Sequence, residues 1–135
     1  MKFFTVLINV ALLAACSVRS SDEEQVRELI ASAEAAAEAR DASDVLALVD
    51  DAYEDTSGFD KTQLRNFLRG YFLAHPKLDL AVNISQLEFP ADGLAQAEVS
   101  VTSLELNDPD HARLRVEFRR SNGEWRVSRA DRLRP

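Results

Sequence analysis

This sequence of 135 residues is poor in the residue types that cross-link small domains or bind metals. Cys16 is its single cysteine, so a disulfide within the chain is excluded. Its two histidines, His75 and His111, stand far apart, and no second cysteine accompanies them. Because metal sites need clustered ligands, we expect no metal and no cofactor. The fold must therefore depend on an apolar core alone.

Basic residues are also scarce, with 16 against 23 acidic ones and a formal net charge of −7. This acidity argues against a nucleic-acid partner. The charge is uneven: 13 acidic and 2 basic residues lie between Asp22 and Asp60, whereas eight arginines and three acids follow His111. Such asymmetry can mark separate binding surfaces. We favour the simpler interpretation, in which an acidic helical half attracts a basic sheet half.

A long hydrophobic run is missing as well. The apolar segment from Phe3 to Ala14 has twelve residues, of which only Thr5 and Asn9 are polar. A membrane-spanning helix needs about 20 apolar residues, so this segment is too short to be one. A basic start at Lys2, a short apolar stretch and small residues after it are typical of a secretory signal peptide.

The segment ends in Leu13-Ala14-Ala15-Cys16, which resembles the lipobox of bacterial lipoproteins. The resemblance implies a signal peptide at 1–15, cleavage between Ala15 and Cys16, and fatty acyl chains such as palmitate on Cys16. Residues 16–21 would then form the lipidated N-terminus and a short linker. Ser17, in place of an aspartate, implies the outer membrane, facing the periplasm. The alternatives are an ordinary signal peptide with a leftover cysteine, or a buried N-terminal helix.

Three helices are predicted after this segment. Ser21 to Glu24 has the pattern of a capping box, and an apolar stripe continues to about Arg40. A short second helix contains Val45, Leu46 and Val49. Asp60 can cap a third helix that reaches His75, because Pro76 cannot continue it.

After Pro76 the apolar period changes from 3.6 to 2, which predicts strands. The alternation slips between Ile84 and Leu87 and again between Val101 and Leu104, so we expect a bulge or a sharp bend at each place. Turns are predicted at 90–93, 107–110 and 121–124, the last of the Asn-Gly type. The sequence therefore predicts an α+β fold, with three N-terminal helices packed in the concave face of a strongly curved antiparallel sheet.

From Asp22 to Pro135 the chain resembles the nuclear transport factor 2-like superfamily, whose domain is a cone. The resemblance is carried by the segments 39–44, 58–60 and 122–127. It implies a cavity between helices and sheet. The inward positions would be Leu80, Val82, Val99, Val101, Leu114, Val116, Phe118 and Trp125 from the strands, with Leu29, Leu46, Leu64, Phe67 and Phe72 from the helices. The catalytic sets of the family's isomerases and dehydratases do not match this chain.

Five residues are candidates for lining that pocket. Tyr53 and Asp55 follow the second helix, where the chain could cross the mouth of the cone. Tyr71 and His75 share one face of the third helix because they are four residues apart. Trp125 begins the last strand. The structural alternatives are a turn acid beside a half-buried tyrosine, a histidine at a helix C-terminus, and a core tryptophan.

We therefore expect a lipid-anchored envelope protein that binds a small apolar ligand in its cone or serves as a protein-interaction module. The alternative is an isomerase or hydrolase that uses Asp55, Tyr53 or His75 on an apolar substrate. The outward face of the strands is highly polar, with Arg113, Arg115 and Arg119 in alternation. This polarity predicts a monomer or a weak dimer.

Overall fold

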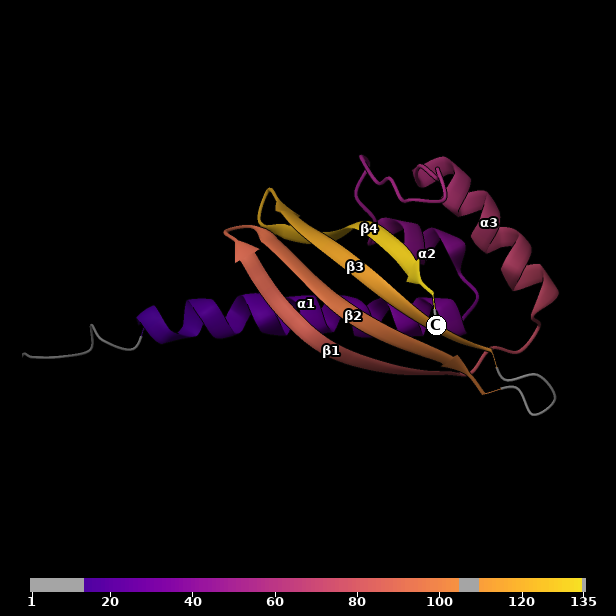
Figure 1. Cartoon of the computed structure of the whole chain (residues 1–135), viewed down its shortest axis with the longest axis horizontal. Helices are drawn as coiled ribbons and strands as arrows, with labels where there is room; N and C mark the ends of the chain where they lie inside the picture. Colours follow the sequence, from indigo (N-terminus) through magenta and orange to yellow (C-terminus); the bar gives the residue numbers. More distant parts are fainter. Residues whose placement is uncertain (1–13, 105–109, 135) are drawn as a thin grey trace, which may run out of the picture.

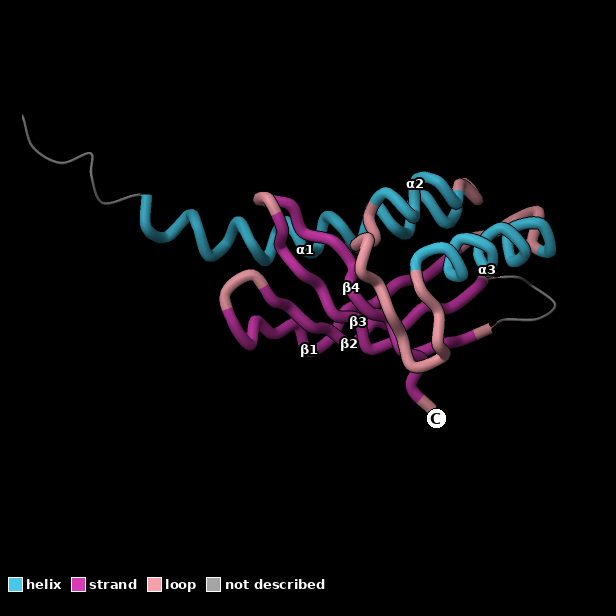
Figure 2. Tube along the Cα trace, turned by 90° about the horizontal axis from the view of Figure 1, so that it is seen from above, coloured by secondary structure: helices cyan, strands magenta, loops and turns pink. Residues whose placement is uncertain are grey.

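The computed structural model describes residues 14–104 and 110–134, with side chains from Asp22 onward. The helices are α1 (Ala14–Glu38), α2 (Ala42–Ala47) and α3 (Lys61–Ala74). The strands are β1 (Leu80–Ala91), β2 (Leu94–Ser103), β3 (His111–Ser121) and β4 (Glu124–Leu133), paired in that order in one antiparallel sheet. The sheet is curved, α1 lies across one of its faces, and α3 lies beyond one end (Figures 1 and 2). The predicted α+β architecture is confirmed.

The helices α2 and α3 each begin directly after an aspartate that can cap a helix. Asp41 caps α2 by accepting a hydrogen bond from the Asp44 backbone N–H, and Asp60 forms a complete capping box with Gln63 at the start of α3. In contrast, α1 begins at Ala14, so the predicted capping box at Ser21 is wrong and the backbone of the predicted linker, 16–21, is helical. That segment has no glycine or proline to end a helix.

One of the two predicted bulges is present. The register of β1 against β2 shifts between Ser85 and Glu88, where Gln86 adopts a φ of 53°. At the second place there is no bulge, because β2 pairs regularly with β1 from Glu98 to Ser103 and the strand ends there. Leu106 and the predicted turn residues 107–109 lie outside the described residues.

Strand β4 has a bulge that we did not predict. Glu117 pairs with Arg129 and Phe118 with Val127, so Ser128 is the extra residue. Next to it, the Val127 backbone bonds to Leu48 and Asp50, which lie just after α2. This contact adds a short parallel bridge to the free edge of β4 and attaches the helical layer to the sheet.

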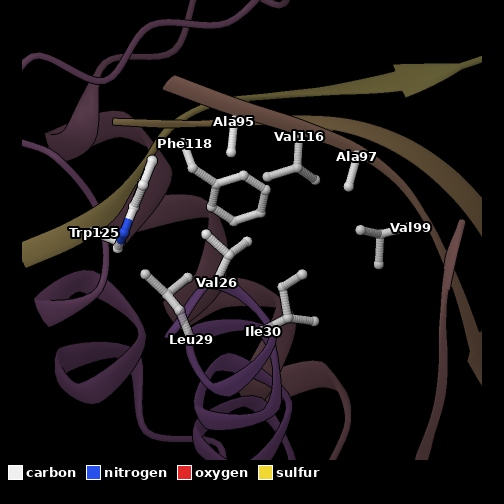
Figure 3. Close-up of a cluster of buried hydrophobic side chains, with 9 residues drawn as sticks. All are labelled: Val26, Leu29, Ile30, Ala95, Ala97, Val99, Val116, Phe118 and Trp125. Atoms are coloured by element: carbon white, nitrogen blue, oxygen red, sulfur yellow. The ribbon is translucent and has the colours of Figure 1, made fainter. Parts of the chain in front are cut away.

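The main core lies between α1 and the concave face of the sheet (Figure 3). Val26, Leu29 and Ile30 of α1 are buried, and Phe118 of β3 is only 1% exposed. The buried strand residues around them are Ala95, Ala97, Val99, Val116 and Trp125. Because alanine side chains are small, Ala95 and Ala97 leave room between β2 and α1 for the larger side chains of this core. Side chains of α1 therefore fill the part of the concave face that α1 covers.

A second cluster joins α2 to α3. Leu46, Val49 and Tyr53 are buried there, and Leu64 and Leu68 of α3 pack against them. Phe72 is also buried, as predicted, but Phe67 is 52% exposed, so its predicted inward position is wrong. The reason is that α3 packs on α2 rather than across the strands. One apolar face of α3 is therefore only partly covered.

Candidate functional site

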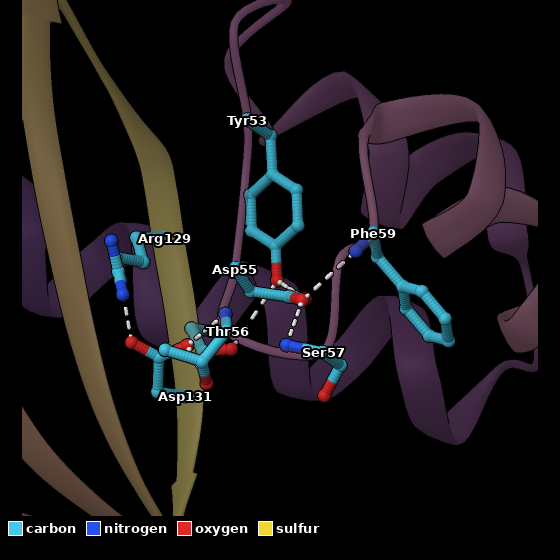
Figure 4. Close-up of polar contacts among 8 residues, drawn as sticks. Tyr53, Asp55, Thr56, Ser57, Phe59, Arg129 and Asp131 are labelled. Atoms are coloured by element: carbon cyan, nitrogen blue, oxygen red, sulfur yellow. Dashed lines mark hydrogen bonds and ion pairs between the residues drawn. The ribbon is translucent and has the colours of Figure 1, made fainter.

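Tyr53 and Asp55, two of the five candidates, meet in the structure (Figure 4). The Tyr53 hydroxyl donates to Asp55 Oδ2 at 2.7 Å and lies 3.3 Å from the Ala130 carbonyl oxygen of β4. The other carboxylate oxygen, Oδ1, accepts from the backbone N–H groups of Ser57 and Phe59 at 2.9 and 3.1 Å. The pair thus fixes the loop between α2 and α3 against the sheet.

A second contact holds the same loop to β4. Thr56 donates to Asp131 Oδ1 from both its backbone N–H and its hydroxyl, each at 2.8 Å. Arg129 donates to the other oxygen of Asp131. Burial acts to raise the pKa of Asp131, but the hydrogen bonds from Arg129 and Thr56 outweigh it and hold this pKa below the ordinary value. The Asp131 charge is therefore part of the loop attachment.

The contacts of Tyr53 and Asp55 indicate a structural role rather than a role in acid–base catalysis. Tyr53 is 2% exposed, and burial followed by its bond to Asp55 raises the pKa of its hydroxyl. The tyrosine therefore stays neutral and donates, while both oxygens of Asp55 already accept hydrogen bonds. A general acid or base must exchange a proton with a substrate near the working pH. The geometry instead assigns Tyr53 and Asp55 to holding the loop.

The raised pKa of Tyr53 predicts a loss of stability in alkali. Because the folded-state pKa exceeds the unfolded value of about 10, Tyr53 stabilises the fold below that pH. This contribution disappears as the pH rises toward the folded-state pKa. We therefore expect wild-type stability to fall more steeply above about pH 10 than that of Tyr53→Phe, which cannot ionise. Urea unfolding at a series of pH values tests this, and equal slopes for the two proteins would contradict it.

Tyr71 and His75 belong to a row of neighbouring aromatic rings that begins at Phe59, just before α3, and continues along that helix. The ring centroids of Phe59 and Phe67 are 5.8 Å apart, those of Phe67 and Tyr71 are 6.2 Å apart, and those of Tyr71 and His75 are 4.0 Å apart. We call these four residues the aromatic row. Phe67 is about half-exposed, and the other three are partly exposed. The row is therefore an aromatic surface that a partner can reach.

His75 also terminates α3. Its Nδ1 lies 2.8 Å from the Tyr71 carbonyl oxygen, and since a carbonyl can only accept, Nδ1 carries the proton in this bond. His75 is the C-cap residue of the helix. Asp55 bonds to Ser57 and Phe59, just before the N-terminus of α3, so the 14 residues of the helix, about 21 Å, separate it from His75. His75 is thus remote from the Tyr53–Asp55 pair, and the three side chains do not form one catalytic set.

Trp125 occupies a third place, at the hairpin end of the sheet. Its ring is 6% exposed and its Nε1–H donates to Asp22 of α1 at 3.3 Å. The Arg120 guanidinium lies 5.4 Å from the ring centroid and forms an ion pair with Asp22 at 3.0 Å. Trp125 also contributes to a surface depression of about 370 Å³ beside α1. Its contacts indicate that Trp125 anchors α1 to the sheet.

The five candidates thus fall into three separate places. Among residues 22–104 and 110–134, no group of three or more His, Cys, Asp or Glu side chains could hold a metal ion. In the same part of the chain, Ser103 is the buried polar residue, and its hydroxyl makes no hydrogen bond. Among the residues described, the buried side chains of the concave face are therefore apolar apart from Ser103.

The polar outer face of the sheet is organised in cross-strand pairs. Glu98 of β2 stands opposite Arg115 of β3, whose other neighbour is Asp131 of β4. Opposite charges on adjacent strands stabilise each other modestly. Of the arginines after His111, Arg120 contacts an acid of α1, whereas Arg126 and Arg129 form ion pairs within β4. Among the residues described, the ion pair that joins a helix to the sheet is therefore Asp22–Arg120.

Comparison with known proteins identifies the fold. Neither a protein-family model nor a curated protein matches the sequence. A nuclear transport factor 2-like protein of unknown function from Pseudomonas putida KT2440 is similar over 86% of this chain and 88% of its own, with 21% identity and a TM-score of 0.67. Two Nostoc punctiforme structures of unknown function with a cystatin-like fold are also similar. One has 12% identity and a TM-score of 0.72, covering 86% of this chain and 78% of its own. The other has 19% identity and a TM-score of 0.65, covering 84% and 90%. The chain therefore has the cone-shaped α+β fold of nuclear transport factor 2-like proteins.

Proposed function

We propose that this chain is a lipid-anchored, periplasm-facing envelope protein that recognises an apolar partner protein through the aromatic row of α3. The observation that carries the proposal is the exposure of Phe67, which is 52% accessible although its ring lies between those of Phe59 and Tyr71. Large aromatic side chains often supply the central contacts of protein interfaces. The tether itself is inferred from Cys16 and the short apolar segment before it.

Three features favour recognition over catalysis. The Tyr53 hydroxyl and the Asp55 carboxylate are engaged with each other and with the backbone. The part of the concave face beneath α1 is occupied by Val26, Leu29 and Ile30, which leaves less room for a small ligand than the sequence suggested. In addition, α3 packs mainly against α2, so the aromatic row lies at the margin of the fold. These features support an open surface rather than an enclosed reaction site.

None of the helices in the described part of the chain has the length and hydrophobicity needed to cross a membrane. The anchor in this proposal is therefore the lipid on Cys16, with the outer membrane as its location. Two or more acyl chains hold a protein at a bilayer far more firmly than one. Such a tether would keep the aromatic row available to a second envelope protein.

Site-specific photocrosslinking in intact cells tests the proposal. A photoreactive amino acid replaces Phe67, and in a matched variant it replaces Asn83, an exposed residue on the outer face of β1. We expect a discrete protein adduct from position 67 and none of that mass from position 83. The same pattern of adducts at both positions, or no adduct at position 67, would overturn the assignment of the aromatic row.

A further inference from the structure

The direction of α1 shows which end of the molecule lies nearest the tether. The helix continues without a break from Ala14 to Glu38, and its first part projects past the tips of the hairpins (Figure 1). Cys16 precedes Asp22 by six residues, or about 9 Å along the helix axis. The hairpin end of the sheet therefore lies within a short distance of the lipid-bearing position.

Both hairpins are attached to α1 at the same point. The Arg120 guanidinium contacts the Asp22 carboxylate at 3.0 and 3.1 Å and Asp92 Oδ1 at 2.8 Å. The Arg120 backbone N–H also donates to the Gly93 carbonyl oxygen at 2.9 Å. These bonds connect α1, the β1–β2 turn and strand β3, so the hairpin end cannot turn away from α1 without breaking them.

The β1–β2 turn carries an apolar tip at this end. Phe89 is 40% exposed and Leu94 is 41% exposed, and Pro90 and Ala91 between them are also exposed. Single exposed apolar residues are ordinary on soluble proteins, but four of the six residues from Phe89 to Leu94 are exposed and apolar, although the Phe89 ring also packs edge-on against Trp125. Asp92, the acid in this turn, is paired with Arg120, so its charge is partly balanced. The exposed apolar side chains of this tip are thus suited to the interfacial layer of a membrane.

We infer that the apolar tip, formed by Phe89, Pro90, Ala91 and Leu94, rests in the interface of the bilayer to which Cys16 is attached. The inference rests on the proposed lipid anchor. It orients the molecule: the hairpin end faces the lipid, while the C-terminal end of α3 and the end of β2 lie at the opposite end of the sheet. Leu73 and Leu104, both exposed, belong to that opposite end.

An environment-sensitive fluorophore on a single introduced cysteine tests this orientation. Once Cys16 carries lipid its sulfur is blocked, so Leu94→Cys provides a unique thiol on the tip and Leu73→Cys a matched one at the far end. Both positions are exposed, at 41% and 84%. Each lipidated, labelled protein is placed in phosphatidylethanolamine–phosphatidylglycerol vesicles. Its fluorescence is compared with that of the same labelled protein carrying C16S, which has no lipid, in buffer without detergent.

We expect the label at position 94 to become several-fold brighter and shifted to the blue on vesicles, whereas the label at position 73 stays as in water. If the protein carries lipid by mass and sediments with the vesicles but the label at 94 remains aqueous, the inference fails while the anchor stands. If Cys16 carries no lipid and the protein does not sediment, the proposed anchor and the inference fail together.

Discussion

Replacing Phe118 by Ala is expected to lower the free energy of unfolding by about 3–5 kcal/mol. The side chain is 1% exposed and lies among Val26, Leu29 and Ile30 of α1 (Figure 3). Truncation removes apolar burial and leaves a cavity that α1, held by Asp22, cannot easily close. Since domains of this size are stable by about 5–15 kcal/mol, the variant should lose a large part of its stability.

Urea unfolding followed through the fluorescence of Trp125, the single tryptophan, measures this effect. Phe67→Ala is the matched control, because the same side chain is removed from a position that is 52% exposed. We expect the control to lose less than about 1 kcal/mol. Equal losses of unfolding free energy for the two variants would show that α1 does not fill this face of the sheet. That result would support a ligand cavity there instead.

Much of the fold could be predicted from local signals. Asp60 and Gln63 predict the start of α3 because two side chains satisfy free backbone groups at once. The slip from Ile84 to Leu87 predicts the bulge in β1, since an extra residue reverses the faces of a strand. The Asn122-Gly123 turn, with φ values of 53° and 77°, follows from the tolerance of these residues for left-handed backbone.

The bulge in β4 could have been found by the same rule. Trp125 and Val127 alternate, but the next apolar residue is Ala130, three positions later, and the extra residue is Ser128. Alanine is a weak marker of a buried face, so the sequence indicates this slip in the alternation only weakly. The contact of Val127 with Leu48 and Asp50, in contrast, joins segments far apart in the sequence, and no local pattern contains it.

The candidate site was less predictable than the fold. The spacing of Tyr71 and His75 correctly placed both on one face of α3, but spacing cannot say whether another element covers that face. Phe67 was therefore assigned to the interior although it is half-exposed. Likewise, the proximity of Tyr53 and Asp55 in the sequence could not show that the backbone of Ser57 and Phe59 already occupies the carboxylate.

Cys16→Ser is expected to move the protein almost completely from the membrane fraction to the soluble fraction. Without the thiol no lipid can be attached, and each buried methylene of an acyl chain contributes about 0.8 kcal/mol to membrane binding. The apolar tip alone buries only a few side chains, so its binding should be weak and reversible. The acidic net charge of −7 gives no added attraction to anionic lipids.

Fractionation of cells that produce the wild-type chain and C16S, together with the mass of the mature N-terminus, tests the lipid anchor most directly. We expect wild-type protein in the outer membrane with a diacylated N-terminal Cys16, and the variant in the soluble fraction without lipid. Wild-type protein that retains Met1 or lacks lipid, or a C16S variant that stays with the membrane, would contradict this expectation.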